Sequence, residues 1–136
     1  MSASKKLSNS VKALIYLQAH FPTPKRSAEI ASSIGCNASK IRQLLSLLVK
    51  NNIVESTQGS SGGFKLARDP SELHLQEIYC AIEDQKAFPI ETETSDSETK
   101  TIDHYFSGLF SDIQIEIENK MKTISLASVI KSIKNE

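Results

Sequence analysis

Four polar side chains of the kinds that read nucleic-acid bases lie within five consecutive positions of the chain. They are Ser39, Lys40, Arg42 and Gln43. Glutamine pairs through two hydrogen bonds with adenine, and arginine pairs in the same way with guanine or binds a phosphate. If a helix presents these residues together, they are predicted to contact base edges in the major groove of DNA.

A helix over residues 38–50 would present them on one side. The apolar residues of this stretch recur at helical spacing and form one stripe: Ile41, Leu44, Leu45 and Leu48. Asn37 is the predicted N-cap of this helix. A shorter helix over residues 28–34, with Ser27 as its N-cap, precedes it and ends at Gly35. Two short helices joined by a tight turn indicate a helix-turn-helix, although a structural helical hairpin with a solvated polar face has the same pattern.

A glycine-rich β-hairpin is predicted directly after these helices. Residues 53–57 are rich in β-branched side chains, residues 58–63 form the turn, and residues 64–67 alternate between apolar and polar. A hairpin in this position is a wing. Its glycines allow backbone N–H groups to approach phosphate closely, although a plain turn also needs glycine. The wing residues predicted to contact the minor groove or phosphates are Gln58, Ser60, Ser61 and Lys65.

The charge of the chain is divided unevenly between its two halves. The 136 residues include 16 basic and 16 acidic ones, so the net charge is zero. Residues 1–70 carry a net charge of +7, and residues 71–136 carry a net charge of −7. The first half therefore suits contact with a polyanion, unless its charges cluster by chance on a solvated surface. The residues predicted to neutralise phosphates are Lys25 and Arg26, together with Lys5, Lys6 and Arg68.

Residues that serve catalysis or bind metals are scattered along the chain. His20, His74 and His104 have no carboxylate at metal-ligand spacing, and no GxSxG, HExxH or phosphate-loop signature is present. The acidic run between residues 91 and 98 is predicted to be solvated. The sequence therefore predicts a protein that is not an enzyme and that has no metal site and no cofactor.

The chain has two cysteines, too few for a disulfide framework, which favours a reducing cytoplasm. Cys36 lies in the turn before residues 38–50, where its oxidation would disturb docking to DNA, so it is a candidate redox sensor. The alternative is an inert residue in a turn. Cys80 lies in a short amphipathic helix pattern that begins at Leu75 and is predicted to belong to the core. With no signal peptide and no apolar run near the ~18–20 residues of a membrane span, the predicted location is cytoplasmic.

The last third of the chain has a long helical pattern from residue 102 to residue 121, followed by a short helix over residues 126–133. Its apolar surface is predicted to cover its own domain or a second copy of the chain. The predicted dimerisation residues are Ile102, Phe106, Leu109, Phe110, Ile113 and Ile117. The predicted organisation is a winged-helix DNA-binding domain over residues 1–84, a flexible loop over 85–101, and a dimerisation helix with a terminal short helix over 102–136.

The wing and the helix after it read GSSGGFKLARDPSELHLQEIYCAIED. This segment resembles the winged-helix regulator family of bacteria that includes the iron–sulfur cluster regulator, the nitric-oxide-sensitive repressor and the cysteine-metabolism repressor (IscR/NsrR/CymR-type). The resemblance covers nearly the whole chain, and the glycine-rich wing is its most specific part. The matching positions are Gly59, Gly62–Phe64, Leu66–Arg68, Pro70 and Ala81–Glu83, with Ser27–Ala31 and Ile41–Leu45 upstream.

The resemblance implies a mainly α fold, a winged helix-turn-helix with a two-stranded β-wing and a long C-terminal dimerisation helix. It also implies a homodimer that binds double-stranded DNA at a near-palindromic operator in a bacterial cytoplasm, usually as a repressor. Several members hold an iron–sulfur cluster on three cysteines in the loop after the AIE helix. The loop over residues 85–101 contains no cysteine, so a cluster-free member is expected. Two alternatives stay open: a winged-helix protein–protein adaptor that does not bind DNA, and a thiol-based regulator that uses Cys36.

Overall fold

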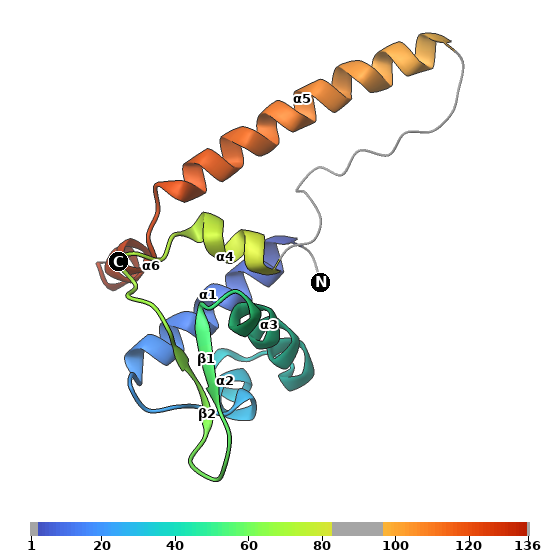
Figure 1. Ribbon diagram of the computed structural model, residues 1–136. Coiled ribbons are helices and arrows are strands. Elements are labelled where there is room, and N and C mark those ends of the chain that lie inside the picture. The colour runs from blue at the N-terminus through green and yellow to red at the C-terminus, as the bar shows by residue number, and fades with distance from the viewer. Residues whose placement is uncertain (1–2, 83–96, 136) are drawn as a thin grey trace.

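The computed structural model describes residues 3–82 and 97–135 of the chain. These residues form a mainly helical protein with one two-stranded antiparallel sheet, which confirms the predicted winged-helix class (Figure 1). The elements in chain order are α1 (Ala3–Ala19), α2 (Ser27–Ile34), α3 (Ala38–Lys50), β1 (Val54–Thr57), β2 (Gly63–Leu66), α4 (Leu75–Ile82), α5 (Ser97–Lys122) and α6 (Leu126–Lys134).

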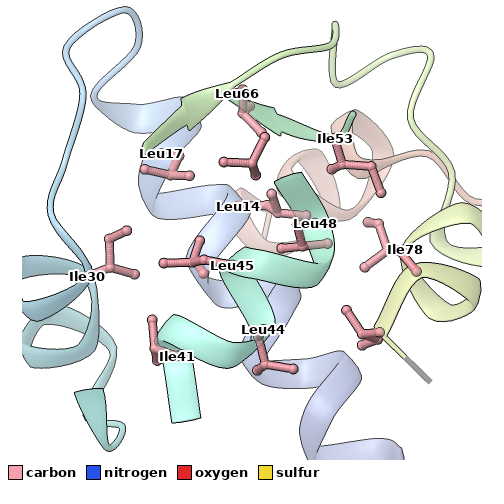
Figure 2. Close-up of a cluster of buried hydrophobic side chains, with 14 of the residues drawn as sticks. Leu14, Leu17, Ile30, Ile41, Leu44, Leu45, Leu48, Ile53, Leu66 and Ile78 are labelled. Atoms are coloured by element: carbon pink, nitrogen blue, oxygen red, sulfur yellow. The ribbon is translucent and has the colours of Figure 1, made fainter. Parts of the chain in front are cut away.

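One hydrophobic core holds the first four helices and the sheet together. The predicted apolar stripe of α3 lies in this core, and Figure 2 shows it surrounded by side chains from α1, α2, β2 and α4. Ile41, Leu45 and Leu48 are completely buried. Each buried leucine or isoleucine side chain contributes roughly 1.5–3 kcal/mol of transfer free energy. The stripe therefore fixes which face of α3 points inward, and its polar face must point outward.

Individual residues determine where α2 ends and where α3 begins. Gly35 adopts a left-handed conformation with φ of 69° and ends α2, as predicted. The Asn37 side chain accepts hydrogen bonds from the backbone N–H groups of Ser39 and Lys40, at 2.9 and 3.2 Å, which confirms its role as the N-cap of α3. The predicted N-cap of α2 is wrong by one residue.

At the start of α2, Ser27 is already helical and Arg26 occupies the N-cap position. The reason lies one turn further on, where the Glu29 carboxylate accepts a hydrogen bond of 3.1 Å from the backbone N–H of Arg26. This reverse half of a capping box satisfies a backbone donor that would otherwise lack a partner. No serine hydroxyl is needed there, so the helix begins one residue earlier than predicted.

The wing is a short hairpin whose second strand is joined to the chain that leads into α2. Val54 pairs with Leu66 and Thr57 pairs with Gly63 in an antiparallel register. Beyond this sheet, the backbones of Lys25 and Phe64 exchange two hydrogen bonds of 2.9 and 2.7 Å. The segment before α2 thus acts as a third, one-residue strand beside β2.

Helix α5 begins at Ser97, so the last five residues of the predicted loop, 97–101, are helical instead. Their polar side chains do not prevent this, because adding a turn to an existing helix costs little and Glu98 is favourable in the first turn. The remaining predicted loop residues, up to residue 96, lie outside the described part of the chain. Figure 1 shows α5 passing α4 and extending well beyond the winged body.

Helix α6 returns to the body after α5. The backbone N–H of Leu126 donates to the carbonyl of Leu73 at 2.7 Å, and that of Leu75 donates to the carbonyl of Ile124 at 2.9 Å. Leu126 is completely buried in the same core as α3. The chain after α5 is therefore fastened to the winged body at the segment that leads into α4. Among the helices described, none is long and apolar enough to cross a membrane.

Candidate nucleic-acid interface

The four predicted base-reading residues lie on the exposed face of α3, opposite its buried stripe. Ser39, Lys40, Arg42 and Gln43 are all exposed to solvent. They occupy the first turns of the helix, directly after the Asn37 cap that fixes where the helix begins. None of the four takes part in an ion pair within the described part of the chain. Their donors and acceptors are available to a ligand.

The tip of the wing is exposed and consists of small side chains. Ser60 and Ser61 lie at its end and are solvent-accessible. A Cβ atom at Gly62 would collide with the carbonyl oxygen of Thr57, and one at Gly63 would lie 2.7 Å from the Lys25 backbone. Both glycines are therefore required by the turn itself and by its contact with the segment before α2. This supports a structural role for both glycines.

Several of the basic residues predicted to contact DNA already have partners, among them Arg68, whose guanidinium lies 2.7 Å from the Glu77 carboxylate. The Lys25 ammonium lies 3.9 Å from the Glu29 carboxylate, and the Lys65 ammonium lies 3.8 Å from that of Glu55. Both pairs are partly exposed and are worth little in solution, so a phosphate can compete for either lysine. The Arg26 guanidinium instead donates to the carbonyl oxygen of Ser60 at 2.8 Å, within the tip of the wing.

A further basic residue, Lys12, lies near the first turn of α3 and was not among the predicted contacts. It lines a concavity of about 420 Å³ between α1, the turn before α3 and the first turn of α3. Lys5 and Lys40 line the same concavity. The signal in the sequence was the seven-residue spacing of Lys5 and Lys12, which puts both on one face of α1.

The two cysteines lie in different elements, and one of them differs from the prediction. Cys36 is half-buried in the turn between α2 and α3, where its sulfur accepts a hydrogen bond of 3.5 Å from the Asn9 amide. Cys80 is exposed, so its predicted place in the core is wrong. It lies on the face of α4 that meets α5, where its thiol is 3.9 Å from the Glu118 carboxylate. Partial burial, together with the charge of Glu118, raises the pKa of the Cys80 thiol.

The predicted dimerisation residues fall into two groups along α5. Ile102, Phe106 and Leu109 are exposed, with 56%, 44% and 38% of their surface accessible. Phe110, Ile113 and Ile117 are half-buried. On the side of α5 that faces α4, the buried Gln114 amide donates to the Tyr79 hydroxyl at 3.2 Å. Helix α5 therefore uses one side for its own body and leaves another uncovered.

The profile of a family described as Rrf2, iron-dependent transcriptional regulator, matches residues 3–132 of this chain. The chain belongs to the Rrf2 family. YwnA of Bacillus subtilis (strain 168), assigned as an HTH-type transcriptional regulator, is 31% identical over 110 residues, which cover 78% of this chain and 82% of YwnA. The HTH-type transcriptional regulator IscR of Photorhabdus laumondii is 36% identical over 61 residues, 45% of this chain and 37% of IscR.

Solved structures agree with the Rrf2 assignment. The structure of T. potens IscR is 26% identical and superposes with a TM-score of 0.68, covering 94% of this chain and 85% of that one. CymR, the global cysteine regulator of B. subtilis, is 20% identical with a TM-score of 0.68, over 93% of this chain and 94% of that one, a likeness of fold. The resemblance found in the sequence is confirmed. This Rrf2 chain is a transcriptional regulator, with DNA-binding regulators and not enzymes as its homologues.

The description of the Rrf2 family as iron-dependent raises the question of a metal site. Iron–sulfur clusters in proteins are held mainly by cysteine thiolates, usually four of them. This chain has only Cys36 and Cys80, in separate elements, and residues 85–101 contain no cysteine. In the two described segments, no group of three or more His, Cys, Asp or Glu could hold a metal ion. The donor set of this Rrf2 chain does not fit such a cluster.

Proposed function

We propose that this Rrf2 regulator binds operator DNA as a homodimer, with α3 of each copy in a major groove. The observation that carries the proposal is the exposed polar face of α3. Arg42 and Gln43 lie within its first turns, where the recognition helix of a helix-turn-helix reaches base edges. Ser39 and Lys40 precede them on the exposed surface and complete the proposed contact.

The wing and the basic residues around it would hold the DNA backbone. Ser60 and Ser61 offer hydroxyl groups and backbone donors at the wing tip, and Lys65 lies at its base. Lys25 and Lys12 add positive charge on the approach to α2 and on α1. Contacts of this kind hold the register of the protein on the duplex and carry no sequence information.

The homodimer rests on the uncovered side of α5. The exposed residues Ile102, Phe106 and Leu109 recur at spacings of four and three, so they form one stripe along the helix, which the half-buried Ile113 continues. A contiguous exposed apolar stripe of this length typically marks an interface. Two such stripes are self-complementary about a twofold axis, which would relate two copies of α3 and favour a near-palindromic operator.

In this proposal, residues 1–84 are the DNA-binding domain and α5 is the dimerisation helix. The half-sites of the operator would be separated by whole turns of the duplex, about 10 base pairs each. The regulator would act without an iron–sulfur cluster, because the chain lacks the thiolate set that would hold one. We expect repression, since a dimer seated on promoter DNA blocks access to it.

The proposal is tested by fluorescence anisotropy with a labelled random-sequence duplex at 50 mM and 200 mM salt, with the mass of the free protein measured in parallel. A dimer that binds at the lower concentration and weakens by about 10³-fold or more at the higher one supports the proposal, because phosphate contacts release counterions. Absence of binding at 50 mM salt would overturn it and favour a protein–protein adaptor. A monomer that still binds would overturn the dimer alone.

A further inference from the structure

The most specific contact between the helix-turn-helix and the wing is made by one side chain. The Arg26 guanidinium reaches the tip of the wing and donates from a single nitrogen, Nη2, to the carbonyl oxygens of Ser60 at 2.8 Å and Gly59 at 3.5 Å. Arg26 is the N-cap residue of α2, so its backbone is fixed by the first helix of the motif. The contact joins positions 33 and 34 residues apart in the chain.

The wing is thereby fastened at two heights. Within its ladder, at the pair next to the turn-closing one, Phe64 is joined to the Lys25 backbone by two hydrogen bonds of 2.9 and 2.7 Å. At its tip, the Arg26 side chain binds the outermost carbonyls. Two attachments, one in the ladder and one at the tip, fix the direction of the hairpin, whereas the ladder attachment alone would leave the tip free to move.

Little else restrains the tip. Among the described residues, its remaining hydrogen bonds are internal to the hairpin. The Gly62 N–H donates to the Gly59 carbonyl at 3.1 Å, the Gly63 N–H donates to the Thr57 hydroxyl at 3.2 Å, and that hydroxyl donates to the Gly63 carbonyl at 3.4 Å. Gly59 has a φ of 99°, and the side chains at the tip are small and exposed. A turn of this composition has many accessible conformations, so ordering it costs conformational entropy.

We propose that Arg26 is a positioning residue, which sets the wing at a fixed angle to α3 so that both reach DNA together. The inference rests on the proposed DNA binding, and it assigns Arg26 a task other than a direct phosphate contact. Its neighbour Lys25 provides the contrast. The Lys25 side chain faces the Glu29 carboxylate and makes no bond to the wing, to which only its backbone is joined.

The deciding experiment is a double-mutant cycle between Arg26 and the wing tip. The second change replaces residues 58–62 by a two-residue Asn-Gly turn, which suits a tight hairpin and removes the carbonyls that Arg26 binds. We expect Arg26→Ala to weaken duplex binding about tenfold in the native chain, the effect of one charge-assisted hydrogen bond, and less than about twofold in the shortened one. Equal losses in the two chains would overturn the proposal in favour of a phosphate contact.

Lys25→Ala is the matched control, because it removes the same charge one residue earlier and leaves the tip attached. Its loss of affinity is expected to be the same with either wing. If that loss also disappeared with the shortened wing, the cycle would report a general collapse of the interface and the proposal would fail.

Hydrogen exchange of the free protein tests the same attachment without DNA or a shortened wing. We expect Arg26→Ala to speed exchange at the Gly62 and Gly63 amides, while the Ile41 amide in α3 stays unchanged. Unchanged exchange at both glycines overturns the proposal even if affinity falls. If the native protein binds no duplex, the proposed function fails, yet the exchange measurement still decides whether Arg26 holds the wing.

Discussion

The winged body buries its apolar side chains, whereas helix α5 leaves several of its own exposed. In the body, every turn of α3 places an apolar residue in a shared core, and Leu45 and Leu48 have no accessible surface. On α5, apolar residues remain on the outside. Five of the eight large hydrophobic side chains that are exposed in the described residues belong to this one helix. The body buries its apolar side chains as a single copy, whereas α5 leaves several of its own exposed.

The covered residues of α5 lie in its C-terminal half, on the side that faces α4. Its Gln114 and Met121 are buried, and the Gln114 amide is bonded to Tyr79 of α4. The apolar side chains of Ile102, Phe106 and Leu109 remain exposed. A helix with one satisfied side and one unsatisfied side is suited to join a self-sufficient body to a second one.

The largest effect is expected from emptying the core of the body. Leu45→Ala should lower the free energy of unfolding by about 2–5 kcal/mol, because it removes a completely buried side chain and leaves a cavity. Leu47→Ala is the control on the same helix. Leu47 has 37% of its surface exposed, so its loss should cost less than about 1 kcal/mol. Urea denaturation measures both, and equal costs would contradict the burial of the α3 stripe.

The second largest effect is expected from a substitution on the exposed side of α5. Phe106→Asp should raise the dissociation constant of the dimer at least about 100-fold, since pairing would bury an unpaired carboxylate. The monomer should stay folded, because Phe106 is 44% exposed and outside the core. Ile115→Asp is the matched control: Ile115 is 56% exposed, but it lies about 180° around the helix from Phe106. Sedimentation equilibrium gives the mass of each variant, and a dimer that survives Phe106→Asp argues against the α5 interface.

The third effect is expected from substitutions on α3, within the winged body. Arg42→Ala and Gln43→Ala should each cost about 1–3 kcal/mol at one base pair of a selected operator, while Lys25→Ala should weaken all sequences about equally. Because base reading is assigned to the body and dimerisation to α5, the Phe106→Asp monomer is expected to keep the same base preference at an isolated half-site. Competition binding with single-base variants of the operator measures this. If neither Arg42→Ala nor Gln43→Ala changes the affinity, α3 is not the reading helix.

The sequence predicted the helix bounds and caps of the winged body better than its long-range contacts. The bounds of α3, its cap at Asn37 and the end of α2 at Gly35 follow from local rules, because spacing and capping involve neighbours in the chain. The bond from Arg26 to Ser60 joins residues 34 positions apart, and no local pattern indicates it. Cys80 was misplaced for a related reason: its helix is amphipathic, but only the tertiary structure shows that position 80 lies at the edge of the buried face.

The smallest effect concerns the junction of the wing with α4, where Glu77 receives the Arg68 guanidinium at 2.7 Å. Burial raises the pKa of the Glu77 carboxyl, but hydrogen bonds from Arg68 and the His74 backbone, and the nearby positive charge, outweigh it and lower the pKa below 4.5. A lowered pKa means that the folded state releases this proton more readily than the unfolded state. The stabilisation is therefore complete above pH 4.5 and is lost as pH falls through the folded-state value.

Glu77→Gln should accordingly lower the melting temperature by about 2 °C at pH 6, an effect kept small by the solvent exposure of the pair. The difference from the native protein should disappear as pH falls well below 4.5, where both chains are neutral at this position. Glu72→Gln is the control, because Arg68 binds the backbone carbonyl of Glu72 and not its carboxylate. A difference that persists unchanged at low pH would show that Glu77 acts through packing and not through its charge. In that case, packing would hold the junction of the wing with α4 together, as it does the core of the body.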